Sequence, residues 1–150
     1  MSTKAAQQET ASAKLIARWE QICQKLAALT DEMPANKFHY KPIESLRTFE
    51  EVLRHVAFWN YYVADSARGK TPNDTANELS KEEFPTKTAV IKVLRRSAAD
   101  AAGALKEHPE RLTPALTEMV VTFIEHNCEH YGQLAVYARL NGIVPPASRN

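Results

Sequence analysis

The chain has 150 residues, of which 44% are hydrophobic and 25% are charged, and it contains only four glycines. This size and composition predict one globular domain, spanning residues 1–150, that is rich in helix formers. Nineteen Lys and Arg side chains against 18 Asp and Glu give a formal net charge of +1. Such a balance offers no general attraction for nucleic acid or for an anionic membrane, so neither is an expected partner.

Cysteine usage and the lengths of the apolar runs predict a cytoplasmic protein. Cys23 and Cys128 form neither a disulfide framework nor a CxxC pair, which suits a reducing compartment. The first residues lack the apolar stretch of a signal peptide, and no apolar run approaches the length of a membrane span. Both thiols are expected to be packing residues.

Four stretches have the apolar spacing of amphipathic helices. The first covers residues 11–29 and ends before Pro34. A connector, residues 31–47, is too long for a simple bundle turn, so we expect it to lie across one end of the bundle. The second helix begins with a capping box in which Thr48 and Glu51 satisfy each other's backbone donors.

A polar loop without periodicity, residues 68–85, precedes the third helix. This helix should start near Thr86 or Thr88 and continue to about Lys106. Its small residues, between positions 98 and 104, would allow a neighbouring helix to approach closely.

The fourth helix has clear signals at both ends. Thr113 offers a hydroxyl N-cap and Pro114 suits the first helical position, while Asn141 and Gly142 predict a left-handed cap at the other end. Four amphipathic helices without a strand pattern predict an all-α fold, a four-helix bundle with long connections.

Three of the five histidines are candidates for a metal site. His126 and His130 lie four residues apart in the fourth helix, which places two imidazoles one turn apart on one face. His55 lies at the edge of the buried face of the second helix, where it could supply a third ligand. Neutral imidazole is a common ligand of zinc and related ions, and catalytic zinc sites often use three protein ligands with one open position. A divalent metal ion on these three residues is therefore expected.

Other interpretations stay open from the residues alone. Two partly exposed helix histidines can have this spacing by chance, and a third can be incidental. Asn127 follows His126 where zincin proteases place a general-base glutamate, which argues against a metalloprotease. Cys128 points about 160° away from His130 on the helical wheel, so we do not expect it to bind the same ion.

Aromatic and thioether side chains near the histidines are candidates for lining a substrate cleft. They are Tyr40, Trp59, Tyr62, Met119 and Tyr137. Each of them could equally be an ordinary core residue. Asn127 is expected to be a hydrogen-bonded core amide, and His39 and His108 are expected to be surface residues.

The final stretch of the chain resembles the end of the DinB-like (YfiT-like) metalloprotein superfamily. It reads HNCEHYGQLAVYARLNGIVPP, with the family's His-x-x-x-His pair, Gly-Gln-Leu run, Arg-Leu-x-Gly turn and prolines. The earlier stretch FHYKPIESLRTFEEVLRHVAFWNYY is similar to the family's aromatic-proline segment and to the helix that carries its first metal histidine, which matches His55. Tyr131, where many relatives carry Arg, and Asn127-Cys128 inside the pair depart from the commonest pattern and could alter substrate choice.

The resemblance implies an up-down-down-up bundle, often dimeric, with zinc, nickel or another divalent ion on three histidines. Characterised relatives include thiol S-transferases that use bacillithiol and mycothiol-dependent isomerases. For this chain we expect a homodimeric enzyme that depends on a divalent metal ion, with zinc or nickel as the preferred candidates. The enzyme would activate a thiol or water to act on a small molecule. No catalytic residue besides the ligands stands out. The alternatives are a non-catalytic metal- or ligand-binding stress-response module and a structural dimeric bundle.

Overall fold

The computed structural model describes residues 10–108 and 112–150. Its elements are the helices α1 (Ala11–Glu32), α2 (Phe49–Ala67), α3 (Lys87–Lys106) and α4 (Pro114–Leu140), with the short 3-10 turns η1 (Ala35–Lys37) and η2 (Pro146–Ser148). These described ranges contain no strand. The predicted all-α, four-helix bundle is confirmed.

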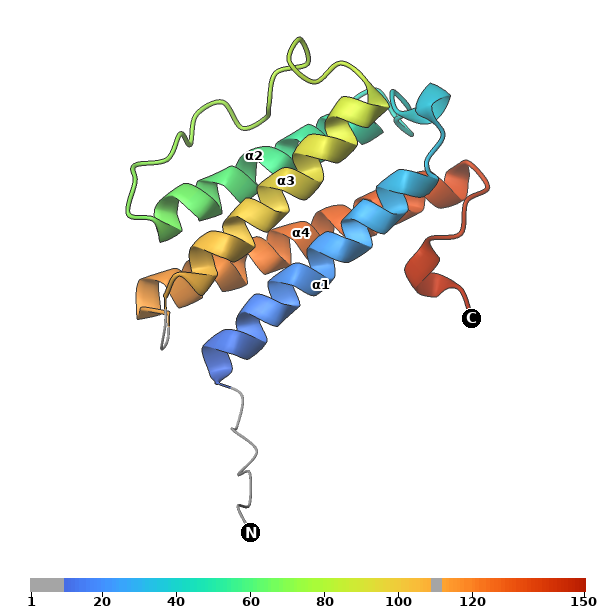
Figure 1. The fold of residues 1–150 in the computed structure, drawn as a ribbon. Helices are drawn as coiled ribbons and strands as arrows, with labels where there is room; N and C mark the ends of the chain where they lie inside the picture. Colours follow the sequence, from blue (N-terminus) through green and yellow to red (C-terminus); the bar gives the residue numbers. More distant parts are fainter. Residues whose placement is uncertain (1–9, 109–111) are drawn as a thin grey trace.

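The helices run up, down, down and up (Figure 1). α1 and α4 point one way and α2 and α3 point the other, so α2 and α3 are parallel neighbours. α1 packs against α3 and α4, and α2 also packs against α3 and α4. The α1–α3 and α2–α4 pairs are therefore opposite sides of the bundle. Because α2 and α3 are parallel, the connection over residues 68–86 must return along the length of the bundle, which explains why it is long.

Every helix begins at a threonine whose hydroxyl accepts a hydrogen bond from the backbone N–H three residues further on. These caps are Thr10, Thr48, Thr86 and Thr113. The Glu51 carboxylate also accepts from the backbone N–H of Thr48 at 2.7 Å, which completes the predicted capping box. Each such cap stabilises a helix by about 1 kcal/mol.

The helix ends follow local backbone rules. Gly142 has a φ of 76°, the left-handed conformation that was predicted after α4. α1 continues to Glu32, three residues beyond the predicted end, and stops because Met33 precedes Pro34. A residue before proline is driven out of the helical region, and Met33 is extended, with φ −72° and ψ 121°.

The predicted apolar stripes form the bundle core. Trp19 and Leu29 of α1, Phe49 of α2, Val90 of α3 and Leu134 of α4 are all completely buried. Burying an aliphatic or aromatic side chain of this size contributes roughly 1.5–3 kcal/mol. The core therefore fixes which face of each helix points inward, and with it the positions of the histidines.

The two long connectors lie against α2. In the first, Phe38 is buried, with its ring centroid 5.3 Å from that of Phe49. Its carbonyl and that of Tyr40 accept hydrogen bonds from the N–H groups of Glu50 and Phe49. The connector thus satisfies free donors at the start of α2 and covers that end of the bundle, as predicted. The second connector, residues 68–86, runs beside α2 (Figure 1).

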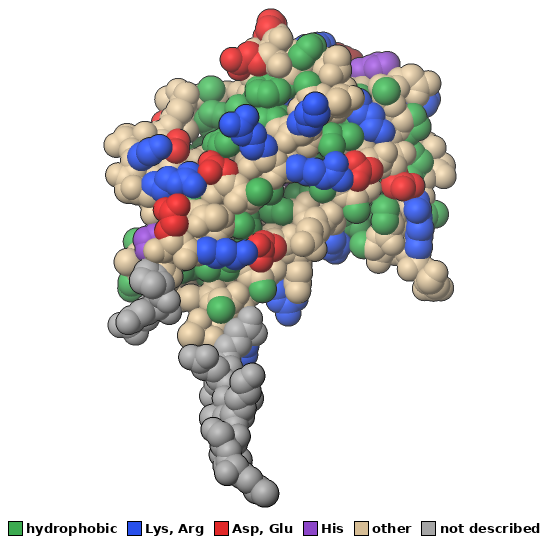
Figure 2. Space-filling model, in the orientation of Figure 1, with side chains coloured by type: hydrophobic (Ala, Val, Ile, Leu, Met, Phe, Trp, Pro, Cys, Tyr) green, Lys and Arg blue, Asp and Glu red, His purple; other side chains and the backbone are tan. Residues whose placement is uncertain are grey.

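The surface formed by α1 and α3 carries interspersed charges of both signs (Figure 2). Ion pairs across these helices join Arg95 to Asp31 and Lys106 to Glu20. This face therefore has no extended patch of one sign, in agreement with the near-neutral net charge. Within residues 10–108 and 112–150, no helix is long and apolar enough to cross a membrane.

Candidate metal centre

Three histidines from two helices converge between α2 and α4. His55 comes from α2, and His126 and His130 lie one turn apart on α4. Their ring centroids are 4.5–4.9 Å apart, and their candidate ligand nitrogens all lie within 4.8 Å of one another. The Nε2 atoms of His55 and His126 are 2.9 Å apart. The structure thus brings together the three residues singled out in the sequence.

The loop between α2 and α3 fixes the ring of His55. The backbone carbonyl oxygen of Asn77 lies 2.6 Å from His55 Nδ1. Because a carbonyl can only accept, Nδ1 must carry a proton and donate it. Asn77 has a φ of 60°, a left-handed conformation that asparagine adopts more readily than most residues. Its side-chain oxygen accepts a hydrogen bond from the Trp59 indole at 3.0 Å, so Asn77 contacts two side chains of α2.

A chain of buried polar groups fixes the ring of His126. Its Nδ1 lies 3.2 Å from Oδ1 of Asn127, whose Nδ2 donates to Asn60 Oδ1 at 3.3 Å. Asn60 donates to the hydroxyl of Ser97, and Ser97 donates to the backbone carbonyl of Leu94. Since the chain ends at an acceptor, every donor in it points from α4 toward α3. His126 Nδ1 must therefore be protonated.

A second side-chain relay fixes the ring of His130. Its Nδ1 lies 3.0 Å from Oε1 of Gln133. Gln133 Nε2 donates to the hydroxyl of Tyr137 at 2.9 Å, and this hydroxyl donates to the backbone carbonyl of Arg47 at 2.9 Å. This chain also ends at a carbonyl, so the same reasoning places a proton on His130 Nδ1.

All three imidazoles are therefore in the same tautomer, with Nδ1 protonated and Nε2 free. The Nε2 lone pairs of His55 and His126 face each other at 2.9 Å without a proton to share. A cation between them would replace this repulsion by coordination, and the third ring is close enough to join. Hydrogen bonds to the nitrogen that does not bind metal are how proteins orient metal-binding histidines. The three free Nε2 atoms are therefore suitable ligands for one divalent ion.

Burial keeps the three rings neutral. Desolvation is the main cause that lowers the pKa of His55 and of His126 to about 4, and it also lowers the pKa of His130. The positive charge of Arg47 lowers the pKa of all three rings further. At neutral pH the Nε2 atoms are thus unprotonated, as metal binding requires.

An aromatic surface borders the histidines. Trp59 stacks on Phe123 with the ring centroids 5.4 Å apart, and Tyr62 contacts both rings. The Phe123 ring lies 5.7 Å from that of His126. All three aromatic side chains are partly exposed. Trp59 and Tyr62, two of the predicted cleft residues, therefore lie beside the histidines and remain accessible.

The other three predicted cleft residues have different surroundings. Tyr137 is buried, and its hydroxyl supports His130 through Gln133. Tyr40 packs edge-on against the Tyr137 ring, with the centroids 5.9 Å apart. Met119 packs against the core at the amino-terminal half of α4. Their contact with a substrate stays a prediction.

Ion pairs that no sequence pattern predicted hold the α2–α3 loop in place. Arg54 is 1% exposed, and its Nε lies 3.1 Å from the carboxylate of Glu78, next to Asn77. Arg47 Nε lies 3.9 Å from the same carboxylate. The loop has no periodicity from which its path could be predicted. The one local signal was Asn77, because asparagine is enriched in left-handed conformations.

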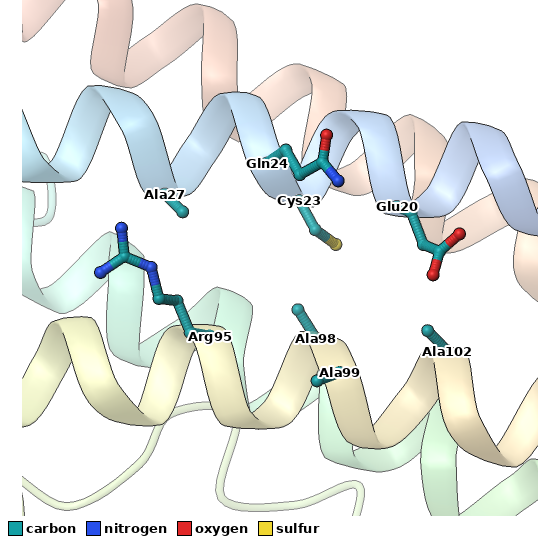
Figure 3. Close-up of a pocket in the computed structure, with 8 residues that line it drawn as sticks. All are labelled: Glu20, Cys23, Gln24, Ala27, Arg95, Ala98, Ala99 and Ala102. Carbon is teal, nitrogen blue, oxygen red and sulfur yellow. The ribbon is translucent and has the colours of Figure 1, made fainter.

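A separate pocket of about 230 Å³ lies between α1 and α3, on the opposite side of the bundle (Figure 3). Cys23 points across it toward Ala98 and Ala99. Burial is the main cause that raises the pKa of the Cys23 thiol to about 12, so the thiol is neutral at physiological pH. Cys128 is exposed on α4. The prediction that both thiols are packing residues is therefore right for Cys23 and wrong for Cys128.

The two remaining histidines lie outside the cluster. His39 is exposed, and the Nε2 of the partly exposed His108 is 2.9 Å from the backbone carbonyl of Ala67. The prediction that Asn127 is a satisfied core amide is confirmed, since it is completely buried and hydrogen-bonded.

Comparison with known protein families shows which family the chain belongs to. The family model described as the DinB superfamily matches residues 18–134, a range that includes all three clustered histidines. A search of curated proteins finds no match. The match covers most of the chain and includes residues of all four helices. The chain therefore belongs to the DinB superfamily.

Proposed function

We propose that His55, His126 and His130 hold one divalent metal ion, and that the protein is a metal-dependent enzyme acting on a small molecule. The observation that carries this proposal is the shared tautomer of the three rings. Three separate hydrogen-bond arrangements, each ending at a backbone carbonyl, protonate every Nδ1 and leave every Nε2 free to bind an ion. Such an arrangement destabilises the protein when no cation is bound and stabilises it when one is bound.

The number of ligands favours an enzyme over a closed binding module. Among the residues that the structure describes, the cluster consists of the three histidines, with no additional Cys, Asp or Glu in the group. Structural zinc sites usually have four protein ligands, whereas catalytic sites have three and leave one position to water or substrate. The convergence of three imidazoles, each with an acceptor on Nδ1, makes incidental histidines in a purely structural bundle the weaker alternative.

A divalent ion held here would lower the pKa of a bound thiol or water and supply a nucleophile at neutral pH. The protein's own residues keep the imidazoles neutral and oriented, and Trp59 and Phe123 offer an apolar surface beside them. We favour thiol S-transfer over hydrolysis because of the resemblance to thiol-dependent relatives. Zinc or nickel as the ion, a low-molecular-weight thiol as cosubstrate and a homodimer as the assembly rest on the same resemblance.

Elemental analysis of protein purified without added metal tests the centre itself. The wild type should carry about one divalent ion per chain, and His55→Ala and His130→Ala should each carry almost none, because three ligands act on one ion. His39→Ala is the matched control and should keep the full metal content, since His39 is exposed and outside the cluster. Equal metal content in all four proteins would contradict the proposed centre.

Turnover can be tested with simple reactants. The metal-loaded wild type should accelerate the reaction of 2-mercaptoethanol with 1-chloro-2,4-dinitrobenzene, in which a carbon–sulfur bond forms, chloride leaves and the thiol proton passes to buffer. The variant His126→Ala should react at the uncatalysed rate. Acceleration of 4-nitrophenyl acetate hydrolysis instead would favour the hydrolase. No acceleration of either reaction, with the metal in place, would favour the non-catalytic module.

A further inference from the structure

Arg47 is connected to the supports of two of the three histidines. Its backbone carbonyl ends the hydrogen-bond chain that starts at His130. Its guanidinium Nε lies 3.9 Å from Glu78, the neighbour of the residue that orients His55. Arg47 therefore lies between the residues that orient His130 and those that orient His55.

The guanidinium of Arg47 shares its carboxylate partner, Glu78, with Arg54. The ion pairs around it join three cations, Arg47, Arg54 and Lys81, to two carboxylates, Glu50 and Glu78. Glu78 lies closer to Arg54, at 3.1 Å, than to Arg47, at 3.9 Å. Arg47 is therefore held more loosely by this carboxylate than Arg54 is.

Accessibility separates Arg47 from the other arginine of this network. The Arg54 side chain is 1% exposed and committed to the loop, whereas the Arg47 side chain is 39% exposed. Guanidinium groups bind carboxylate and phosphate through paired hydrogen bonds, and a partly exposed one needs little desolvation to do so. An anion bound here would also be attracted by a divalent cation on three neutral ligands.

We propose that Arg47 is the subsite for an anionic group of the substrate or cosubstrate, and that this protein selects molecules carrying a carboxylate or similar anion. This inference rests on the proposed function, because it concerns a ligand of the histidine-bound ion. Arg47 does not hold the ion, so its substitution separates ligand selectivity from metal binding.

Calorimetric titration of the zinc-loaded protein tests this subsite. The two probes are 3-mercaptopropanoate and its neutral amide, 3-mercaptopropanamide, which share a thiol and a chain length but differ in charge. The wild type should bind the anion roughly tenfold more tightly than the amide, the size expected for one charge-assisted hydrogen-bonded contact at a partly exposed site. Arg47→Gln should bind both probes equally, and Arg47→Lys should keep part of the preference.

Arg95→Gln is the matched control, because Arg95 pairs with Asp31 on the α1–α3 side of the bundle. It should keep the full preference for the anion. Zinc content is measured on the same samples. Full zinc content with no preference in the wild type, or with an unchanged preference in Arg47→Gln, would overturn the Arg47 subsite alone. Absence of zinc from the wild type would overturn the proposed function together with it.

Discussion

The two sides of the bundle both bury ionisable groups, but only one side orients them. Between α2 and α4, burial lowers the pKa of His55 and His126 to about 4, and between α1 and α3 it raises that of Cys23 to about 12. Both shifts favour the neutral form. The histidines converge and have a hydrogen-bonded acceptor on each Nδ1, whereas Cys23 has one long contact, 3.8 Å from Asn127. A shifted pKa therefore shows only that a group is buried. The candidate site is identified by side chains that converge and whose rings are oriented by hydrogen bonds.

Asn127 connects the two sides. Its carbonyl oxygen accepts from His126, and its amide nitrogen faces Asn60 and the thiol of Cys23. This single buried amide thus contacts the histidine cluster in one direction and the α1–α3 pocket in the other. Substitutions on each side can show whether the sides are independent.

The largest expected difference between the sides is their response to metal. Zinc at one thousand times its dissociation constant should stabilise the wild type by about 4 kcal/mol, because it binds the folded state and not the unfolded chain. His126→Ala should lose this increment, whereas Cys23→Ala should keep it even if its metal-free stability changes. Chemical denaturation with and without zinc measures each increment. An equal increment in His126→Ala would mean that the ion binds elsewhere.

A smaller effect is expected from replacing Asn127, the residue that connects the two sides. Asn127→Ala should lower the free energy of unfolding by roughly 3 kcal/mol, because it leaves buried partners on His126 and Asn60 unsatisfied. It should also weaken zinc binding about tenfold or more, since the ring of His126 loses its orienting acceptor. Ser97→Ala removes only the far end of the chain and should cost about 1 kcal/mol with little loss of zinc affinity. Equal zinc affinities in both variants would refute the orienting role of Asn127.

Replacing Asn77, which contacts α2 from the α2–α3 loop, should give a still smaller effect. Asn77→Ala removes the acceptor of the Trp59 indole and places alanine at a φ of 60°, so we expect a loss of roughly 1–2 kcal/mol. Asn77→Gly loses the same side-chain contact without the strain and should lose less. Both variants keep the backbone carbonyl that orients His55. Denaturation with tryptophan fluorescence measures the difference, and a glycine variant less stable than the alanine variant would contradict this account of the loop.

The sequence predicts what depends on local chemistry. The caps at Thr48, Thr113 and Gly142 follow from residues within one turn of the helix end, and the spacing of His126 and His130 fixes their common face. The core stripes follow from apolar periodicity in the same way. These features are decided by neighbours in the sequence, so they could be identified before the structure was known.

The supports of the histidines depend on partners far apart in the chain. Tyr137 contacts the carbonyl of Arg47, 90 residues away, and Asn77 reaches back 22 residues to His55. No period or motif relates such residues, and helical spacing alone placed Tyr137 on the histidine side without its burial or its hydroxyl partner. The path of the α2–α3 loop is set by ion pairs of Arg54 that form only in the folded chain.

The smallest expected effect is a difference in thiol reactivity between Cys23 on the α1–α3 side and the exposed Cys128 of α4, and it leaves neutral-pH stability unchanged. At pH 7.5 a maleimide reagent should modify Cys128 rapidly and Cys23 slowly, because Cys128 is exposed and the pKa of Cys23 is raised from 9.0 to about 12. Mass spectrometry should find one modified thiol in the wild type and almost none in Cys128→Ser. Since the folded pKa lies above the unfolded one, the contribution of the neutral thiol to stability is complete below pH 9 and is lost as the pH rises toward 12. Rapid modification of Cys23 in the folded protein would mean that the pocket opens to solvent, and the contrast between an oriented side and a merely buried one would then fail.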